Sequence, residues 1–358
     1  MQSRSGRSQQ IRHNYMKIYG LTAALVVVVA LIVAITLTGL GVVSGKNPPS
    51  KTDDPSAAPS LPSANSTLST PAAPDSESGE ESSKEEQVGK IQYIAVTEAD
   101  LKAINPLRIV NASAPFNPSE AKNIVNMFEL ADKSNSKNRL QFLGGTSPLN
   151  KEAFEALQQL QFVVGAENEG FCMMVYQGYI STLSAEGKVN CYCSDSELTD
   201  PSHSSHATGY VVDLRYLKDG AGYQIYDASV KNTATKTLLE NCGRFGWIQS
   251  WSSANLTANG KINTDQRNFR YVGVPHALYI MEKGLTFEGY LEALKTSTNY
   301  NKPLQIIDSA SSTAYSVYYV SADSALTKGV PVPQGATYTV WGNGVDGFIV
   351  TLTSPIGA

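Results

Sequence analysis

The distribution of apolar side chains along the chain predicts a membrane helix near its N-terminus. Residues 18–45 contain no charged side chain, and the centre of this run is almost wholly Ala, Val, Leu and Ile. A helix needs about 20 apolar residues to cross the hydrocarbon core of a bilayer. We therefore predict a transmembrane helix over residues 18–45. The alternatives are a buried core helix and a cleaved signal peptide, whose apolar region is usually only about 7–15 residues long.

The residues on either side of this run predict its orientation and a tether. Residues 1–17 contain Arg and Lys but no Asp or Glu, and such a basic tail stays in the cytoplasm, which places the folded part on the far side of the cell membrane. Residues 46–89 are rich in Pro, Ser, Ala, Asp and Glu. They contain too few large apolar side chains to offset the entropy lost on folding. We predict that they form a disordered linker.

From residue 90 onwards the apolar positions follow the periodicities of folded elements. An apolar residue every three or four positions predicts helices, and short apolar or alternating runs predict strands. Helices are predicted over residues 118–130, 151–164, 236–245, 271–283 and 287–294, and strands over 92–96, 171–179, 210–215 and 247–251. Helices grouped with short, non-alternating strands favour an α+β domain over a parallel doubly wound sheet. We assign this domain to residues 90–300.

Residues 301–358 have a different pattern. Apolar residues alternate over 315–320, 336–341 and 347–352, which predicts strands. Gly342-Asn343-Gly344 supplies residue types suited to a turn between them. We predict a small β module without a helix. It is either a packing extension of the main domain or a binding or spacer module, and the sequence does not separate the two.

Charge and cysteine content narrow the class of protein. A net charge of −4 over 358 residues lacks the basic footprint of nucleic-acid-binding proteins, so no nucleic-acid partner is expected. Cys172, Cys191, Cys193 and Cys242 all follow the predicted membrane helix, where disulfides can persist. The pair 191 and 193 is too close to bond easily with itself. The favoured connectivities therefore join each of them to position 172 or 242, and at least one disulfide is expected. A four-cysteine zinc site and free buried thiols are the alternatives.

One histidine stands in a pattern typical of a metal site. His206 is followed by Gly209 and Asp213, at spacings that allow a loop and a strand end to converge on one ion. Zinc accepts such nitrogen and oxygen ligands, and catalytic zinc sites keep one position open for water. A lone histidine is more often structural or exposed. The remaining histidines after the membrane run are His203, a loop residue, and His276, for which a structural role is favoured.

These residues resemble a known family. The pattern Ser204-x-His206-x-x-Gly209-x-x-x-Asp213 is similar to the first zinc motif of the D-alanyl-D-alanine carboxypeptidases of the LAS-type zinc peptidases. Gln177-Gly178-Tyr179 resembles the Ser-Gly-Tyr turn of this family, and Phe245-Gly246-Trp247-Ile248 resembles its Tyr-Gly-Phe segment. Phe269-Arg270-Tyr271-Val272-Gly273 is similar to the stretch after its second zinc motif. The resemblance covers roughly residues 105–295.

The resemblance implies a fold and an activity. The fold would be that of an α+β zinc hydrolase, and the activity would be removal of the terminal D-alanine from peptidoglycan stem peptides. A zinc ion lowers the pKa of a bound water and polarises the scissile carbonyl, and a carboxylate transfers the water's proton to the leaving amine. An arginine would bind the substrate's terminal carboxylate. The resemblance also places Ser204, Gln177, Tyr179 and Arg270 along the substrate groove, although internal packing is the favoured alternative for Arg270.

The chain departs from the family where the chemistry is done. The second zinc motif of the family is Glu-x-x-His. Here Asp265 holds the position of the base, and Asn268 holds that of the third zinc ligand. An amide is a poor substitute for imidazole as a zinc ligand. The family's carboxylate-binding arginine is Ile180 here. His203 is a possible replacement ligand, which would give a set of His203, His206 and Asp213.

Three hypotheses follow from these substitutions. The favoured one is a membrane-anchored, extracytoplasmic carboxypeptidase-like protein that recognises peptidoglycan stem peptides with impaired or absent catalysis. The second is an active zinc carboxypeptidase with an atypical metal shell, in which Asp265 is the base and Asn268 or His203 completes the ligands. The third is a non-catalytic structural protein of the cell envelope, because a shared fold does not fix a function.

Overall fold

The structure is a computed structural model that describes residues 90–131, 139–145, 147–188, 198–218, 220–225, 227–231, 233–250 and 267–356. All of them lie in one compact unit, Ser83–Ala358. No helix within these ranges is both long enough and apolar enough to cross a bilayer. The predicted membrane helix over residues 18–45 and the predicted linker over 46–89 lie outside the described residues.

A mixed sheet forms the centre of the part of the chain that precedes the C-terminal module. Four of its strands run antiparallel in the order β5 (Phe171–Gln177), β6 (Val211–Lys218), β9 (Asn268–Tyr271) and β8 (Trp247–Gln249). Two short strands extend it: β3 (Gln141–Phe142) lies parallel to β5, and β7 (Ala221–Tyr223) lies antiparallel to β6. Strand β9 is buried along its whole length. With the helices described below, this antiparallel sheet confirms the predicted α+β class.

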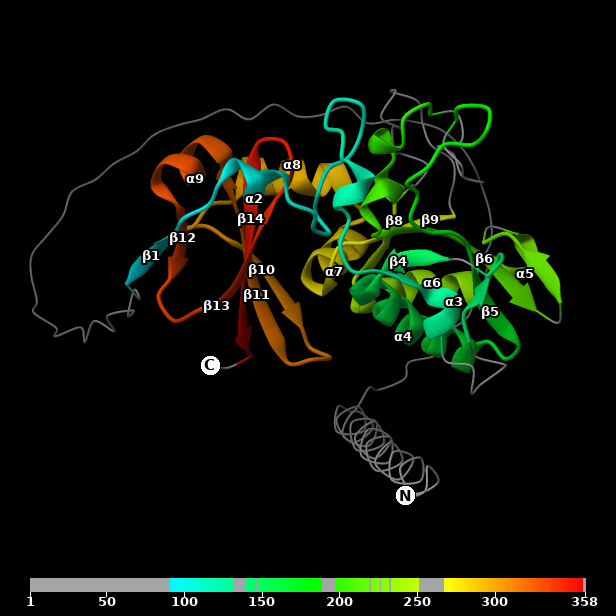
Figure 1. Ribbon diagram of the computed structural model, residues 1–358. Helices are drawn as coiled ribbons and strands as arrows, with labels where there is room; N and C mark the ends of the chain where they lie inside the picture. Colours follow the sequence, from blue (N-terminus) through cyan, green and yellow to red (C-terminus); the bar gives the residue numbers. More distant parts are fainter. Residues whose placement is uncertain are drawn as a thin grey trace, which may run out of the picture. The chain divides into compact units, whose positions relative to one another are not determined.

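Helix α4 (Lys151–Glu167) covers this sheet with the apolar stripe expected from the sequence. Its buried residues recur every three or four positions: Phe154, Leu157, Leu160 and Val164. Asn150 begins the helix, because its side-chain oxygen accepts a hydrogen bond from the Glu152 backbone N–H. Helix α6 (Ala234–Asn241) packs beside α4 and continues into the 3₁₀ helix η5 (Cys242–Phe245). Figure 1 labels α4 and α6 next to the strands of this sheet.

The structure corrects two predicted helix boundaries through backbone conformation. Residues 118–130 form a 3₁₀ turn, η1 (Pro118–Glu120), strand β2 (Ile124–Asn126) and the short helix α3 (Met127–Leu130). A continuous helix is excluded because Asn123 has a positive φ of 56° and because β2 pairs with β4 (Pro148–Asn150). Further along, helix α7 (Val274–Lys283) begins three residues later than predicted. Gly273 has a φ of 84°, so the chain leaves strand β9 before it turns into the helix.

The C-terminal residues form a second sheet, and the prediction that this module has no helix is wrong. The sheet is antiparallel, in the order β10 (Leu304–Asp308), β11 (Thr313–Ser321), β14 (Gly347–Pro355) and β13 (Thr337–Gly342). Helix α9 (Ala322–Lys328) follows β11 directly. Ser321 is its N-cap and accepts a hydrogen bond from Ser324 N. A serine at this position is a helix-start signal, but the alternating apolar residues of the neighbouring strands led to a prediction of strands only.

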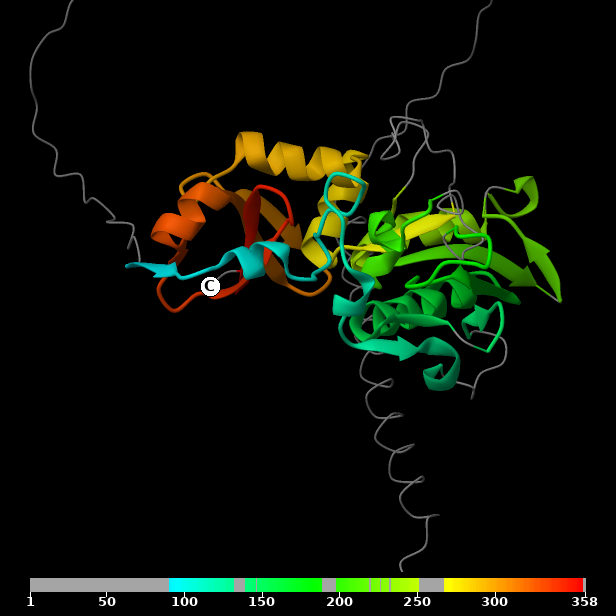
Figure 2. The same ribbon diagram turned by 45° about the horizontal axis from the view of Figure 1, so that its top comes forward.

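The first described residues pack with the C-terminal module and form a separate two-stranded sheet with one of its strands. Strand β1 (Ile91–Ile94) pairs antiparallel with β12 (Val330–Pro333), with Ile91 opposite Pro333. Helix α2 (Glu98–Lys102) contacts β13 and buries Leu101 against Tyr318 and Phe348. Figures 1 and 2 show the cyan β1–α2 segment alongside the orange and red strands. The sheet's core is thus completed by a segment more than two hundred residues earlier in the chain.

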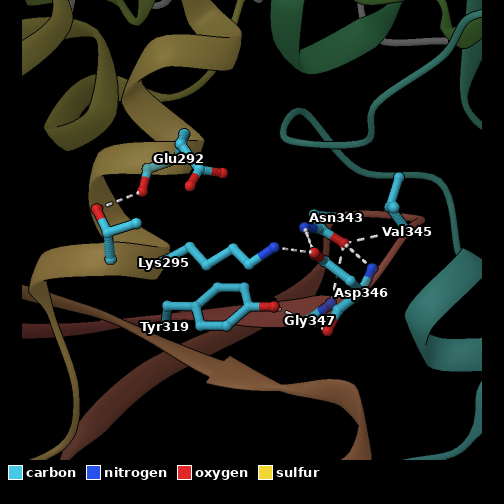
Figure 3. A network of polar contacts seen from close by, with 8 residues as sticks. Glu292, Lys295, Tyr319, Asn343, Val345, Asp346 and Gly347 are labelled. Carbon is cyan, nitrogen blue, oxygen red and sulfur yellow. Dashed lines mark hydrogen bonds and ion pairs between the residues drawn. The ribbon is translucent and has the colours of Figure 1, made fainter.

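Helix α8 (Phe287–Ser297) joins the two sheets through apolar and polar contacts. It buries Phe287, Tyr290 and Leu294, which share a cluster with Ile306 and Val317 of the C-terminal sheet. Its Lys295 side chain donates to Asp346 Oδ2 at 2.7 Å, in the loop between β13 and β14. Figure 3 shows the Tyr319 hydroxyl bound to the Asp346 backbone of this loop, and Asn343 bound to the Asp346 side chain within the loop. The C-terminal module is therefore packed directly onto the helices that follow β9.

The cysteines give a second correction. Cys172 and Cys242 are both buried thiols in this structure, so the expected disulfides that would use either of them are not formed. Cys242 donates through its sulfur to the Leu239 carbonyl at 3.6 Å. Burial raises the pKa of the Cys242 thiol to about 12. Cys191 and Cys193 lie outside the described residues.

Candidate functional site

Two neighbouring strands and one tight turn bring His206, Asp213 and Asn268 together. His206 lies in the 3₁₀ turn η4 (Ser205–Thr208), which Ser204 begins by accepting a hydrogen bond from the His206 backbone N–H at 3.2 Å. Gly209 ends the turn with a φ of 76°, a conformation that favours glycine. Asp213 on β6 lies directly opposite Asn268 on β9. The sequence motif is therefore a turn that delivers His206 to a pair of facing strand residues.

The three side chains form one buried chain of hydrogen bonds. His206 Nδ1 lies 2.8 Å from the Gly178 carbonyl oxygen, so Nδ1 carries the proton and donates it. Asn268 Nδ2 lies 3.1 Å from His206 Nε2 and 3.1 Å from Asp213 Oδ1. The two acceptor atoms, His206 Nε2 and Asp213 Oδ1, are 3.8 Å apart. Each of the three residues is at most 2% exposed.

This donor set does not fit a zinc ion as it is arranged. Ligands of tetrahedral zinc sit about 2.0–2.2 Å from the metal, and each presents a lone pair to it. Asn268 instead presents its NH₂ group, which has hydrogens to donate and no lone pair for a metal. The nearest arrangement to a ligand pair is His206 with Asp213. Within the described residues, no three His, Cys, Asp or Glu side chains are grouped so that they could hold a metal ion.

The expected replacement ligand, His203, does not join the cluster. His203 ends a separate 3₁₀ turn, η3 (Pro201–His203), whose N-cap is Asp200. Its side chain is 32% exposed, and its Nε2 lies 3.8 Å from Asp200 Oδ2. Ser204 ends this turn and begins η4, so the two histidines lie in separate turns. Of the set His203, His206 and Asp213, the structure brings only His206 and Asp213 together, while Asp265 lies outside the described residues.

Arg270 is a structural residue in this geometry and not a groove residue. Its guanidinium donates to the backbone carbonyls of Pro106 and Arg108 and stacks 3.9 Å above the Phe287 ring. It is 4% exposed, and burial lowers its pKa to about 10. The alternative that assigned Arg270 to internal packing is the one that the contacts support, so the substrate-binding assignment of Arg270 is corrected.

The other groove residues of the resemblance have mixed roles. Gln177, the last residue of β5, is half-buried and lies opposite Asp213 across a bulge in the strand pair. Tyr179 donates its hydroxyl to the Pro118 carbonyl at 2.8 Å, which ties this turn to η1. Ser204 is fully buried and serves as the cap of η4. Of these residues, Gln177 is the one that the strand pairing places next to the His206–Asp213–Asn268 cluster.

Sequence reasoning missed the part that Gly178 plays in the site. Its carbonyl oxygen fixes the His206 ring, and a Cβ at this position would lie 2.3 Å from the Pro148 backbone oxygen. Only glycine fits this close approach. The Gln177-Gly178-Tyr179 motif was visible in the sequence, but its partner His206 lies 28 positions later, and no local pattern links the two.

His276 is a buried residue of the core and not a metal ligand. Its Nδ1 lies 2.7 Å from the Tyr290 hydroxyl, and its Nε2 lies 3.3 Å from Thr351 Oγ1. Both ring nitrogens are therefore occupied by uncharged partners. Burial lowers the pKa of His276 to about 3, so the ring is neutral at ordinary pH. The predicted structural role of His276 agrees with these contacts.

Comparison with known proteins was made for sequence and for fold. No family model matches the chain. A D-alanyl-D-alanine carboxypeptidase of Enterococcus faecium is 29% identical over 117 residues, which are 33% of this chain and 36% of that protein. The match thus spans about a third of the relative's own length.

Solved structures give the fold comparison. The crystal structure of the vancomycin-resistance D,D-dipeptidase VanXYg, in complex with a D-Ala-D-Ala phosphinate analog, has a TM-score of 0.54 at 20% identity. It covers 74% of this chain and 100% of that chain. The LD-carboxypeptidase LdcB has a TM-score of 0.39 at 20% identity, over 53% of this chain and 87% of that chain.

The fold and the buried His–Asp pair thus define the class as α+β proteins with a D,D-dipeptidase-like fold. The resemblance to the D-alanyl-D-alanine carboxypeptidase family is confirmed by the sequence match as well as by the fold. His206 and Asp213, which carry part of this resemblance, lie together with Asn268 in the structure.

Proposed function

We propose that this chain is a membrane-anchored, extracytoplasmic protein that binds the D-alanine end of peptidoglycan stem peptides with impaired or absent hydrolysis. The resemblance to D-alanyl-D-alanine carboxypeptidases supports the ligand class. The observation that carries the loss of hydrolysis is the orientation of Asn268, whose NH₂ group donates to both His206 and Asp213. Hydrolysis by this family's route requires a metal-activated water, and these donors face the atoms that would bind the metal.

The membrane anchor rests on the sequence alone. The uncharged run over residues 18–45 and the basic tail before it favour an N-terminus in the cytoplasm. A polar linker of residues 46–89 would let the folded unit reach cell-wall peptides above the membrane. Protease treatment of intact cells tests this topology. Digestion of the folded unit in intact cells supports it, and protection until the membrane is broken contradicts it.

A second candidate is an active zinc carboxypeptidase with a rearranged site. It is favoured by one observation, which is that His206 Nε2 and Asp213 Oδ1 remain only 3.8 Å apart. Two ligand atoms of a tetrahedral zinc site lie about 3.3 Å apart. In this candidate the Asn268 amide turns over to offer its oxygen, and Asp265 acts as the base. A third candidate, a structural envelope protein, keeps the fold and binds no peptide.

One experiment separates the three candidates. The full chain in detergent is titrated with a peptide ending in D-Ala-D-Ala and with the same peptide ending in L-Ala-L-Ala, while released alanine and bound zinc are measured. Selective binding of the D-peptide without alanine release supports the proposed function. Release of D-alanine, lost together with bound zinc in a His206→Ala variant, supports the active enzyme. Binding of neither peptide supports the structural protein.

A further inference from the structure

Asn268 has one polar atom that the cluster does not use. Its two N–H groups are both engaged, one by His206 Nε2 and one by Asp213 Oδ1. Its carbonyl oxygen, Oδ1, is buried and has no hydrogen-bond partner among the described residues. A buried acceptor without a partner costs roughly 1–3 kcal/mol. Such a cost at the centre of a buried polar cluster points to a group that is supplied by a ligand.

The chemistry of the neighbours fixes which end of the amide faces them. His206 Nδ1 donates to the Gly178 carbonyl, which leaves a lone pair on Nε2. Asp213 Oδ1 is a carboxylate oxygen and accepts hydrogen bonds. If the amide were turned over, Asn268 Oδ1 would face two acceptors and no donor would lie between them. The arrangement with NH₂ toward His206 and Asp213 is therefore the one that satisfies the cluster without a metal.

We propose that the Asn268 side chain takes the place of the metal ion in this groove, bridging His206 and Asp213 and offering its Oδ1 to a peptide N–H. In a zinc peptidase the metal attracts an oxygen, the scissile carbonyl. Here the ligand meets the hydrogen-bond acceptor Asn268 Oδ1, so the ligand group that is recognised is a donor N–H and not a carbonyl oxygen. The groove selects peptides that carry an amide N–H at the position facing Asn268, and it needs no metal to do so. This inference rests on the proposed function, because it assumes that the groove binds a peptide end.

The acceptor role is tested with ester analogues of the ligand. A D-Ala-D-Ala-ended peptide is compared with two analogues in which one or the other of its last two amide N–H groups is replaced by an ester oxygen. One analogue is expected to bind the full chain about 10- to 100-fold more weakly, because an ester oxygen offers no hydrogen to Oδ1. Equal binding of all three peptides overturns the acceptor role and leaves the proposed function standing. Binding of none of them counts against both.

The bridge is tested separately, by thermal unfolding with zinc and with chelator. Wild-type protein is expected to unfold at the same temperature in both. Asn268→Asp exchanges the two donors for a carboxylate and creates a His–Asp–Asp set, so zinc should raise its unfolding temperature well above that in chelator. Asn299→Asp is the matched control, because Asn299 is exposed and its side-chain oxygen only accepts hydrogen bonds. Zinc stabilisation of the wild type equal to that of Asn268→Asp overturns the bridge.

Discussion

Mild acid should destabilise the folded unit through His276. The ring is 1% exposed, and its hydrogen-bond and ring partners among the described residues are the uncharged Tyr290, Thr351 and Trp341. Burial lowers its pKa from an ordinary 6.5 to about 3 in the folded state. The imidazole therefore binds a proton below about pH 6.5 in the unfolded chain, but only below about pH 3 in the folded protein. Stability from this residue is complete above pH 6.5 and is lost as the pH falls through that window.

The size of the effect follows from the two pKa values. At pH 5, which is about 1.5 units below the ordinary pKa of 6.5, the unfolded imidazole is protonated and the folded ring is not. At about 1.4 kcal/mol per unit, the loss is about 2 kcal/mol. Near pH 3 the loss would approach about 4 kcal/mol. Either value is a large share of the 5–15 kcal/mol that typically stabilises a folded protein.

Urea unfolding of wild type and of His276→Gln at pH 7 and pH 5 measures this effect. The variant is expected to be less stable at pH 7, because glutamine does not fill the ring's place between Tyr290 and Thr351. The gap between the two proteins should shrink by about 2 kcal/mol at pH 5, since only the wild type loses stability through this residue. His203→Gln serves as the control, because His203 lies on the surface. A gap that is the same at both pH values would refute the reasoning.

Three further predictions concern packing, one hydrogen bond and one thiol. Gly178→Ala should cost about 1–3 kcal/mol of stability and loosen the His206 ring, since a Cβ there would lie 2.3 Å from a backbone oxygen of β4. The control Gly145→Ala has open space around it and should be nearly neutral. Equal unfolding temperatures of the two variants would contradict this prediction. Tyr271→Phe should cost about 1 kcal/mol in urea unfolding, because the buried hydroxyl donates to Glu152 at 2.8 Å; no change would mean that this bond contributes nothing. Cys242 should resist iodoacetamide at pH 8 in the native protein and react once the protein is unfolded, because burial raises the pKa of the thiol to about 12. Rapid labelling of Cys242 in the native protein, measured by mass spectrometry, would contradict this prediction.

Local signals explain the elements that the sequence allowed us to predict. The stripe of Phe154, Leu157 and Leu160 predicted α4, and the structure buries that stripe. Where the sequence misled us, a single backbone angle usually decided the outcome. Asn123 in the left-handed region divides the predicted helix over residues 118–130, and apolar spacing carries no information about that angle.

The candidate site was predictable as a set of positions but not as a set of contacts. The resemblance placed His206, Asp213 and Asn268 at one site, and the strand register of β6 and β9 joins two of them. Which end of the Asn268 amide faces its neighbours depends on the proton of His206, and that proton is set by the distant Gly178 carbonyl. Such a hydrogen-bond network joins residues that are distant in the sequence, so the spacing of residues along the chain does not predict it.

The pairing of β1 with β12 has a consequence for how the protein is made. Ile91 and Pro333 lie opposite each other although almost the whole folded unit is synthesised between them. During translation, β1 and the apolar face of α2 therefore remain without their partners until the C-terminal strands have been synthesised. Such non-local pairings slow folding, and an unpaired strand edge is a site of aggregation while it waits. The topology therefore leaves the first strand of the folded unit unpaired until one of its last strands has been synthesised.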